Sequence, residues 1–316
     1  MAERAIVTLS LNPAIDHTAR VPNFTAGRVN RVEWEQADAG GKGVNVASFL
    51  ADAGLAVVAT GLLGGANIEP FTELFARKHI VDRCVRLAGR TRVNVKIVDP
   101  VLDQVTDINF PGLTPSAQEL AQQTATLEEL CAECDWFVLS GSVPAGVPSD
   151  IYAQLLRRLK ARGKRVLLDA SGAPLAAGVG AGPDIIKPNI DELAELVGRP
   201  LSGQAEVLAA AQSLVQDGVG LVAVSMGGDG ALFVEGGGAV VALPPAVEVH
   251  STVGAGDAMV AGILVGTLRG LDLGERARLA TAFALGALSA VGPNLPSAET
   301  LASFAGGVRV STVAKQ

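Results

Sequence analysis

Short apolar runs alternate along the chain with longer segments in which apolar residues recur every three or four positions. The short runs are rich in Val, Leu and Ile and predict strands at residues 5–11, 57–63, 136–140, 165–169, 185–187 and 221–225. Most of them are apolar at consecutive positions, as in strands that are covered on both faces. The longer segments predict helices at residues 44–53, 71–78, 117–133, 149–162 and 192–197. This alternation predicts an α/β fold with a parallel sheet between two layers of helices.

Two N-terminal regions, residues 15–36 and 92–110, interrupt this alternation, because they show no helix between their predicted strands. Residues 92–97 read Arg-Val-Asn-Val-Lys-Ile, an alternation of polar and apolar side chains that is typical of a half-exposed antiparallel strand. The two regions therefore predict a small second sheet beside the main one. This sheet is either a lid over a site or a decorated edge.

The C-terminal third departs from the pattern again. Residues 231–234 and 239–241, separated by three glycines, predict a hairpin. A short strand at 247–249 and a glycine-rich turn follow, and two apolar helices are expected to begin at Asp257 and Gly274. The length of 316 residues alone suggests about two domains. No repeat, low-complexity tract or linker divides the sequence, however.

Composition excludes several classes of protein. Hydrophobic residues make up 49% and charged residues 18%, which excludes intrinsic disorder. The net charge of −7 argues against nucleic-acid binding, so an anionic ligand must be held by a few placed cations and backbone amides. The apolar stretches 258–268 and 279–291 are shorter than a membrane span, and residues 1–11 lack a signal-peptide pattern. Three cysteines do not form a disulfide framework, so a reducing cytoplasm is expected.

The sharpest motif is Ser-Thr-Val-Gly-Ala-Gly-Asp-Ala at residues 251–258. The amides of Gly254, Ala255 and Gly256 can point in one direction, because no large side chain obstructs them. They lie at the start of a helix, where the helix dipole favours negative charge. We interpret them as an anion hole for a transferring phosphoryl group, with Asp257 placed to accept a proton from the attacking hydroxyl. The alternative is a glycine turn in which Asp257 caps the helix.

Two further segments suit a polyhydroxylated, anionic ligand. Residues 39–47 form a glycine-rich entry into a helix, with Lys42 as a cation and Asn45 as a donor on the first turn. Close packing of helix on sheet would also explain the glycines. Asp16 follows the first strand, at the sheet edge where open α/β proteins bind ligands, and can accept hydrogen bonds from adjacent sugar hydroxyls. The alternative for Asp16 is an Asx turn.

Two segments suit a nucleotide and its metal. In residues 187–192, Asn189 and Glu192 share one face of a helix start and either hold the water ligands of Mg²⁺ or form a capping pair. In residues 225–230, Ser-Met-Gly-Gly-Asp-Gly follows a predicted strand. Its glycines allow an adenine nucleotide to lie close to the backbone, and a tight hairpin turn would explain them equally well.

In this order, the segments resemble the phosphofructokinase B family of ribokinase-like carbohydrate kinases. The resemblance runs almost end to end through residues 12–16, 40–47, 140–144, 187–192, 225–230 and 251–257. It implies a ribokinase-like three-layer α/β/α sandwich, a single domain over residues 1–316, with a small β-sheet lid from about 12–36 and 90–112. It also implies phosphorylation of a sugar phosphate with ATP and Mg²⁺, no nucleic-acid or membrane partner, and a homodimer through the lid.

The resemblance assigns roles to individual residues as well. Asp257 is the expected catalytic base, and the expected anion hole comprises Gly254, Ala255 and Gly256. The sugar phosphate is expected to contact Asp16, Gly40, Gly41, Lys42, Asn45 and Arg92. The nucleotide side is expected to include Lys187, Asn189, Ser225, Gly227, Gly230 and Thr252, with Asn189 and Glu192 near magnesium.

The lid segments at 89–96 and 105–110 resemble those of family members that act on fructose 1-phosphate. Members that act on fructose 6-phosphate place an arginine where this chain has Asp107, and a carboxylate repels a phosphate dianion. The expected reaction is therefore phosphorylation of the 6-hydroxyl of D-fructose 1-phosphate. The alternatives are a tagatose-6-phosphate kinase, a 6-phosphofructokinase, and a non-catalytic sensor of sugar phosphate or nucleotide. Arg28 stands where some members have lysine, and its role stays open.

Overall fold

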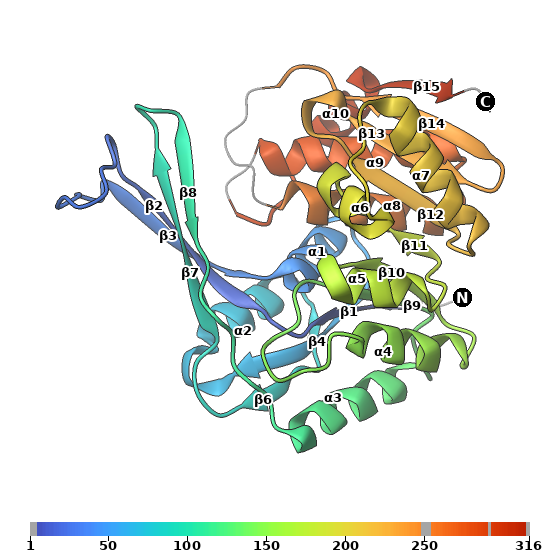
Figure 1. Cartoon of the computed structure of the whole chain (residues 1–316). Coiled ribbons are helices and arrows are strands. Elements are labelled where there is room, and N and C mark those ends of the chain that lie inside the picture. The colour runs from blue at the N-terminus through green and yellow to red at the C-terminus, as the bar shows by residue number, and fades with distance from the viewer. Residues whose placement is uncertain (1–4, 248–253, 290–291, 314–316) are drawn as a thin grey trace.

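The computed structural model describes residues 5–247, 254–289 and 292–313. A large mixed sheet lies between two layers of helices, and a smaller sheet extends from one side (Figure 1). The strands of the large sheet are β1 (Ile6–Ser10), β4 (Val57–Gly64), β5 (Val81–Asp82), β6 (Val85–Leu87), β9 (Trp136–Ser140), β10 (Arg165–Asp169), β11 (Ile185–Ile186), β12 (Leu221–Ser225), β13 (Ala231–Glu235), β14 (Gly238–Leu243) and β15 (Arg309–Val313).

These strands follow the order β15-β14-β13-β12-β11-β10-β9-β1-β4-β5, with β6 paired to β4. Strands β12, β11, β10, β9, β1 and β4 are mutually parallel, and β13, β14 and β15 run antiparallel to their neighbours. The sequence predicted β9, β10 and β12 with their observed bounds, and β1, β4 and β11 to within one residue at each end. The predicted hairpin is β13–β14. Val247 lies outside any strand, and residues 248 and 249 of that predicted strand are outside the described residues.

The helices cover both faces of the sheet. They are α1 (Lys42–Asp52), α2 (Glu69–Arg77), α3 (Ala117–Leu130), α4 (Ile151–Lys160), α5 (Gly172–Val179), α6 (Ile190–Val197), α7 (Gln204–Gln216), α8 (Ala255–Leu268), α9 (Leu273–Leu288) and α10 (Ala298–Gly307), with short 3₁₀ turns at Gly65–Asn67 and Gly227–Asp229. One apolar core lies between the sheet and the helices α1, α2, α8, α9 and α10. The other lies between the sheet and the helices α3, α4, α5, α6 and α7. The predicted three-layer arrangement is confirmed. Within the described segments, no helix is long and apolar enough to cross a membrane.

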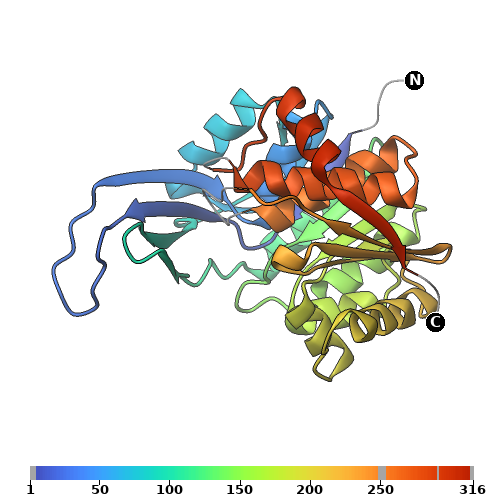
Figure 2. The ribbon, with the colours of Figure 1, turned by 90° about the horizontal axis from the view of Figure 1, so that it is seen from above.

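The smaller sheet, which we call the lid, comprises β2 (Ala14–Arg20), β3 (Trp34–Gly40), β7 (Arg92–Asp99) and β8 (Gln104–Ile108) in the order β3-β2-β7-β8. Strand β7 runs parallel to β2 and antiparallel to β8. The view in Figure 2 shows the lid extending sideways from the body. The second sheet that the two interrupted regions predicted is therefore present. Strand β3 continues four residues past the predicted end at residue 36, so that only Gly41 separates it from α1.

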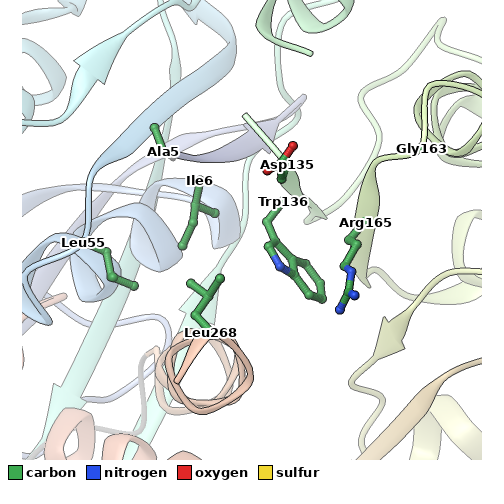
Figure 3. A pocket seen from close by; sticks show the side chains of 8 residues that line it. All are labelled: Ala5, Ile6, Leu55, Asp135, Trp136, Gly163, Arg165 and Leu268. Carbon is green, nitrogen blue, oxygen red and sulfur yellow. The ribbon is translucent and has the colours of Figure 1, made fainter. Parts of the chain in front are cut away.

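A cavity of about 380 Å³ lies at the amino ends of β1, β9 and β10. Its lining residues are Ala5, Ile6, Leu55, Asp135, Trp136, Gly163, Arg165 and Leu268 (Figure 3). The guanidinium carbon of Arg165 lies 5.6 Å from the centre of the Trp136 ring. Because open α/β sheets bind ligands at the carboxyl ends of their strands, this cavity is at the opposite edge from the candidate site.

Candidate active site

The candidate site is centred on Asp257 in the first turn of α8. Asn45, in the first turn of α1, donates a hydrogen bond of 2.8 Å from Nδ2 to Oδ2 of Asp257. Both side chains are buried, Asp257 being only 7% exposed. The bond therefore joins the two glycine-rich helix starts that the sequence singled out separately.

The environment of Asp257 changes its acidity. Burial, together with the nearby charge of Asp169, raises its pKa from 3.8 to about 7. Lys42, Asn45 and Lys187 oppose this shift. A carboxylate with a pKa near neutrality is suited to accept a proton in one step and release it in the next. This environment suits a base, and the catalytic role of Asp257 stays a prediction.

Asp169 is a member of the site that the sequence analysis missed. It ends strand β10 and is buried, with Oδ1 3.1 Å from Nζ of Lys42 and 3.6 Å from Nζ of Lys187. Burial alone would raise the pKa of Asp169, but the two ammonium groups hold it below the usual value. Burial likewise would lower the pKa of Lys42, yet the carboxylates of Asp169 and Asp257 raise it. The cluster thus keeps Lys42 charged near Asp257.

Oδ2 of Asp169 is buried and has no hydrogen-bond partner among the described residues. The same holds for the hydroxyls of Ser140 and Ser10, which lie in register with Asp169 on the adjacent strands β9 and β1. Buried polar atoms are nearly always paired in folded proteins. A polar side chain that ends an apolar strand, as in Val-Leu-Leu-Asp, was the signal that could have revealed Asp169 in the sequence.

The start of α8 has the geometry of an anion site. Gly254 is the N-cap residue and adopts the left-handed conformation at φ 79°, and no described side chain caps the helix. A Cβ at Gly254 would lie 3.3 Å from Cζ of Phe49, and one at Gly256 would lie 3.4 Å from Nζ of Lys187. The first amides of a helix have no partners within it. The helix begins at Ala255, so the predicted start at Asp257 was two residues too late, and Asp257 is not the N-cap residue. Thr252, which was predicted on the nucleotide side, lies outside the described residues.

On the sugar side, Asp16 projects from strand β2 beside β7. Nδ2 of Asn94 donates a hydrogen bond of 3.0 Å to Oδ1 of Asp16, a partner that the sequence analysis did not identify. Burial raises the pKa of Asp16, while Asn94, Arg92 and Lys96 lower it. A Cβ at Gly40 would collide with the Asp16 carboxylate. The glycine therefore leaves room for this side chain, which supports its predicted place in the site.

Gly41 and Lys42 link the lid to the body. Gly41 adopts φ 100°, and a Cβ there would lie 2.8 Å from Cα of Pro13, so both conformation and space require glycine. Lys42 begins α1 and reaches Asp169 rather than the lid. The structure therefore places Lys42 near Asp169 and Asp257, and its contact with the sugar phosphate stays a prediction.

Arg92 is occupied differently from what the resemblance implied. Its Nε donates to the carbonyl of Pro13 at 3.3 Å, Nη2 to that of Asn12 at 2.9 Å, and Nη1 to that of Phe110 at 3.1 Å. These three bonds tie the segments that follow β1 and β8 to the lid. A role of Arg92 on the sugar phosphate stays a prediction.

On the nucleotide side, Asn189 and Glu192 form a capping box at the start of α6. The Glu192 amide donates to Oδ1 of Asn189 at 2.7 Å, and the Asn189 amide donates to Oε2 of Glu192 at 2.9 Å. The capping alternative is thus present, and the magnesium role stays a prediction. Among the described residues, no three His, Cys, Asp or Glu side chains cluster as metal ligands. Lys187 is buried just before this helix, against Asp169.

The segment 225–230 forms a tight turn between β12 and β13. The amide of Met226 donates to the carbonyl of Gly230 at 2.8 Å, and that of Ser225 donates to the carbonyl of Pro188 at 3.0 Å. Gly230 has φ 87°, and a Cβ there would collide with the carbonyl of Ala242, whereas Gly227 faces open space. The hairpin-turn alternative is therefore present here. Ser225 also forms an isolated parallel β-bridge with Asn189, so the two segments that were predicted to bind the nucleotide lie side by side.

Comparison with known proteins decides the family. The profile of the pfkB family of carbohydrate kinases matches residues 5–301. The chain belongs to the pfkB family of carbohydrate kinases. As a member of this family it is a phosphotransferase, and the resemblance inferred from its motifs is confirmed.

Among pfkB family relatives, the chain is 54% identical over 309 residues to a 1-phosphofructokinase of Rhodobacter capsulatus, covering 98% of each chain. The solved phosphofructokinase-2 of Escherichia coli in complex with substrates and products matches with a TM-score of 0.90 and 30% identity, over 96% of this chain and 98% of that one. The tetrameric inhibited form of the same enzyme matches with a TM-score of 0.88 and 29% identity, over 96% and 98%. The fold is therefore that of the ribokinase-like members of this family.

Proposed function

We propose that the chain transfers the γ-phosphoryl group of ATP to the 6-hydroxyl of D-fructose 1-phosphate, giving fructose 1,6-bisphosphate and ADP. The single observation on which the proposal of phosphoryl transfer rests is the buried Asp257, whose pKa is about 7. It lies in the first turn of α8, a helix whose N-cap residue is Gly254. The identity of the substrate is supported by the 1-phosphofructokinase relative at 54% identity. The lid supports it as well, because this chain has Asp107 where members that act on fructose 6-phosphate place an arginine and so lacks that cation for a 6-phosphate.

In the proposed reaction, Asp257 accepts the proton of the 6-hydroxyl as that oxygen attacks the γ-phosphorus. Asn45 holds Oδ2 of Asp257, which leaves Oδ1 available to the hydroxyl. Phosphoryl transfer passes through a loose transition state with charge on the equatorial oxygens. The amides at the start of α8 and the ammonium of Lys187, next to Gly256, are placed to stabilise that charge.

Lys42 and Asp169 hold the site in a charged but balanced state. Lys42 pairs with Asp169 at 3.1 Å and lowers the pKa of Asp257, so it favours the deprotonated base. Asp169 acts in the opposite direction. The pKa of Asp257 is thereby kept near the pH at which proton transfer in both directions is effective.

The residues present also suit Mg²⁺, which prefers oxygen ligands and retains several waters. Oδ2 of Asp169 is buried and unpaired among the described residues, and Glu192 is close enough to Lys42 to raise its pKa. Asp169, Asn189 and Glu192 would therefore hold the ion or its waters. When bound, magnesium would neutralise negative charge on the phosphates of ATP.

We further propose that the lid forms a homodimer in a reducing cytoplasm. Large apolar side chains on or beside the lid are exposed: Trp34 is 44% exposed, Val105 49%, Ile108 44% and Phe110 47%. They lie on the two edge strands of the lid, β3 and β8, or directly after β8, and exposed apolar surface at such edges suits an interface. The three cysteines, Cys84, Cys131 and Cys134, are free thiols, which suits a reducing compartment. Trp34→Glu is expected to shift the mass seen by light scattering to that of the monomer, and an unchanged mass contradicts the dimer.

A coupled assay of ADP release tests the proposed function. The specificity constant kcat/KM is measured for fructose 1-phosphate, fructose 6-phosphate and tagatose 6-phosphate. We expect fructose 1-phosphate to rank first. A preference for either 6-phosphate would overturn the substrate assignment and the interpretation of Asp107, while leaving the kinase chemistry intact. Binding of ATP and sugar phosphate without ADP formation would instead indicate a sensor.

A further inference from the structure

One face of the lid carries a row of polar side chains next to the sugar side of the site. Because side chains alternate along a strand, Arg92, Asn94 and Lys96 of β7 share one face. In the parallel pairing of β7 with β2, Asn94 lies beside Asp16, and Lys96 lies one same-face position farther out. On the other side of β7, Asp107 of β8 is the direct partner of Lys96.

When the attacking hydroxyl of a sugar phosphate lies at Asp257, the phosphate group that the sugar already carries lies elsewhere. That phosphate needs a cation of its own. Arg92 is a weak candidate, because its three nitrogens already donate to the backbone carbonyls of Asn12, Pro13 and Phe110. Lys42 lies against Asp169, beside the base, where the transferring group belongs. Neither cation is placed to serve as a dedicated site for a phosphate on the far end of the sugar.

Lys96 is a cation whose donor hydrogens are not all used, and it lies near the sugar side of the site. Its ammonium has three donor hydrogens, and Nζ lies 2.7 Å from Oδ1 of Asp107, which uses one of them. It is near enough to Asp16 to lower the pKa of that carboxyl. Adjacent same-face residues of a strand are about 6.6 Å apart. Lys96 therefore lies one same-face step along the lid from the pair formed by Asn94 and Asp16.

The two members of this ion pair differ in exposure. The side chain of Lys96 is 17% exposed, and that of Asp107 is 51% exposed. Asp107 can therefore turn into water at little cost when a dianion arrives, while Lys96 stays in place. Exposed ion pairs of this kind contribute little to stability. The pair is easily opened by a ligand that carries more negative charge than one carboxylate.

We propose that Lys96 binds the phosphate group that the sugar substrate already carries, and that Asp107 aligns the ammonium while the site is empty. The inference rests on the proposed function for the identity of that sugar phosphate. It assigns the two residues different tasks, because Lys96 supplies affinity and Asp107 supplies orientation before binding.

Initial-rate kinetics of Lys96→Gln test the proposal with fructose 1-phosphate and with fructose, which lacks the phosphate. We expect KM for fructose 1-phosphate to rise at least about tenfold, the order of magnitude of one hydrogen bond to a charged group. The KM for ATP and the kcat/KM for fructose are expected to change by less than about twofold. Lys96→Arg is expected to recover most of the affinity. Lys160→Gln is the matched control, because it removes a Lys160–Asp184 pair of 3.0 Å on another part of the molecule.

Asp107→Asn removes only the alignment of the ammonium, so KM for fructose 1-phosphate is expected to rise by less than in Lys96→Gln. An equal loss of kcat/KM for fructose and for fructose 1-phosphate in Lys96→Gln would overturn the proposal, since it would indicate a general support of the lid. An unchanged KM would overturn it as well. If the wild type prefers fructose 6-phosphate, the proposed function fails, and the same comparison with that sugar phosphate still tests Lys96.

Discussion

Replacement of Asp257 by asparagine removes the proposed proton acceptor and also a carboxylate that the fold keeps away from water. Asp257 is 7% exposed, and burial together with the charge of Asp169 raises its pKa from 3.8 to about 7. We expect Asp257→Asn to lose at least about 100-fold in kcat, the low end of general-base contributions. We also expect the inactive variant to be more stable than the wild type above neutral pH.

The magnitude follows from the two pKa values. The pKa of Asp257 in the folded chain lies above its ordinary value, so the stability that its protonated form contributes is complete below about pH 3.8 and is lost as the pH rises through about 7. Each pH unit between these limits corresponds to about 1.36 kcal/mol. The ionised carboxylate therefore costs about 4 kcal/mol at pH 8.

Urea unfolding of the wild type and of Asp257→Asn at pH 5, 6, 7 and 8 measures this cost. The difference in the free energy of unfolding is expected to grow by about 2 to 3 kcal/mol in favour of the variant between pH 5 and pH 8, and to level off above neutral pH. Asp217→Asn removes an exposed carboxylate at the end of α7 and reports the effect of net charge alone. A difference that does not change with pH would refute the reasoning, because it would mean that the fold does not raise the proton affinity of Asp257.

Three further expectations concern the same site. In a pH–rate profile, the kcat/KM of the wild type is expected to rise with pH up to about pH 7. Asn45→Ala is expected to shift this rise to higher pH, because the Asn45 hydrogen bond lowers the pKa of Asp257. Gly254→Ala, at φ 79°, is expected to destabilise by at least about 1 kcal/mol in calorimetry. Arg92→Gln is expected to make residues 104–112 more sensitive to limited proteolysis, because it breaks the bond to the Phe110 carbonyl.

Much of the body was predictable because its strands are buried on both faces. Strand β9 is apolar at four of its five positions, and β10 has three consecutive apolar residues between Arg165 and Asp169, so the sequence indicates where each strand begins and ends. Helix α7 was missed because its Ala- and Gln-rich sequence has only weak amphipathic contrast, and α5 because glycine and proline occur within it. The edge strand β15 was missed as well, since only two of its five residues are apolar.

The candidate site was predictable where glycine marks it and not where long-range pairing creates it. Gly254 and Gly41 stand out in the sequence, and the structure gives each a conformational or steric reason. Asp169 and Asn94 act through partners that the sequence does not reveal, because Asp169 meets Lys42 only after β10 joins the sheet. Register between strands that are distant in the chain decides such contacts.

A single residue, Gly41, connects the last residue of the lid strand β3 to the helix that carries Asn45. A change in the orientation of β3 would therefore reach the hydrogen bond that Asn45 gives Asp257 through a single residue. Because that bond lowers the pKa of Asp257, any change that weakened it would raise the proton affinity of this carboxylate. A ligand that moved the lid in this way would also take up protons from the solvent as it binds.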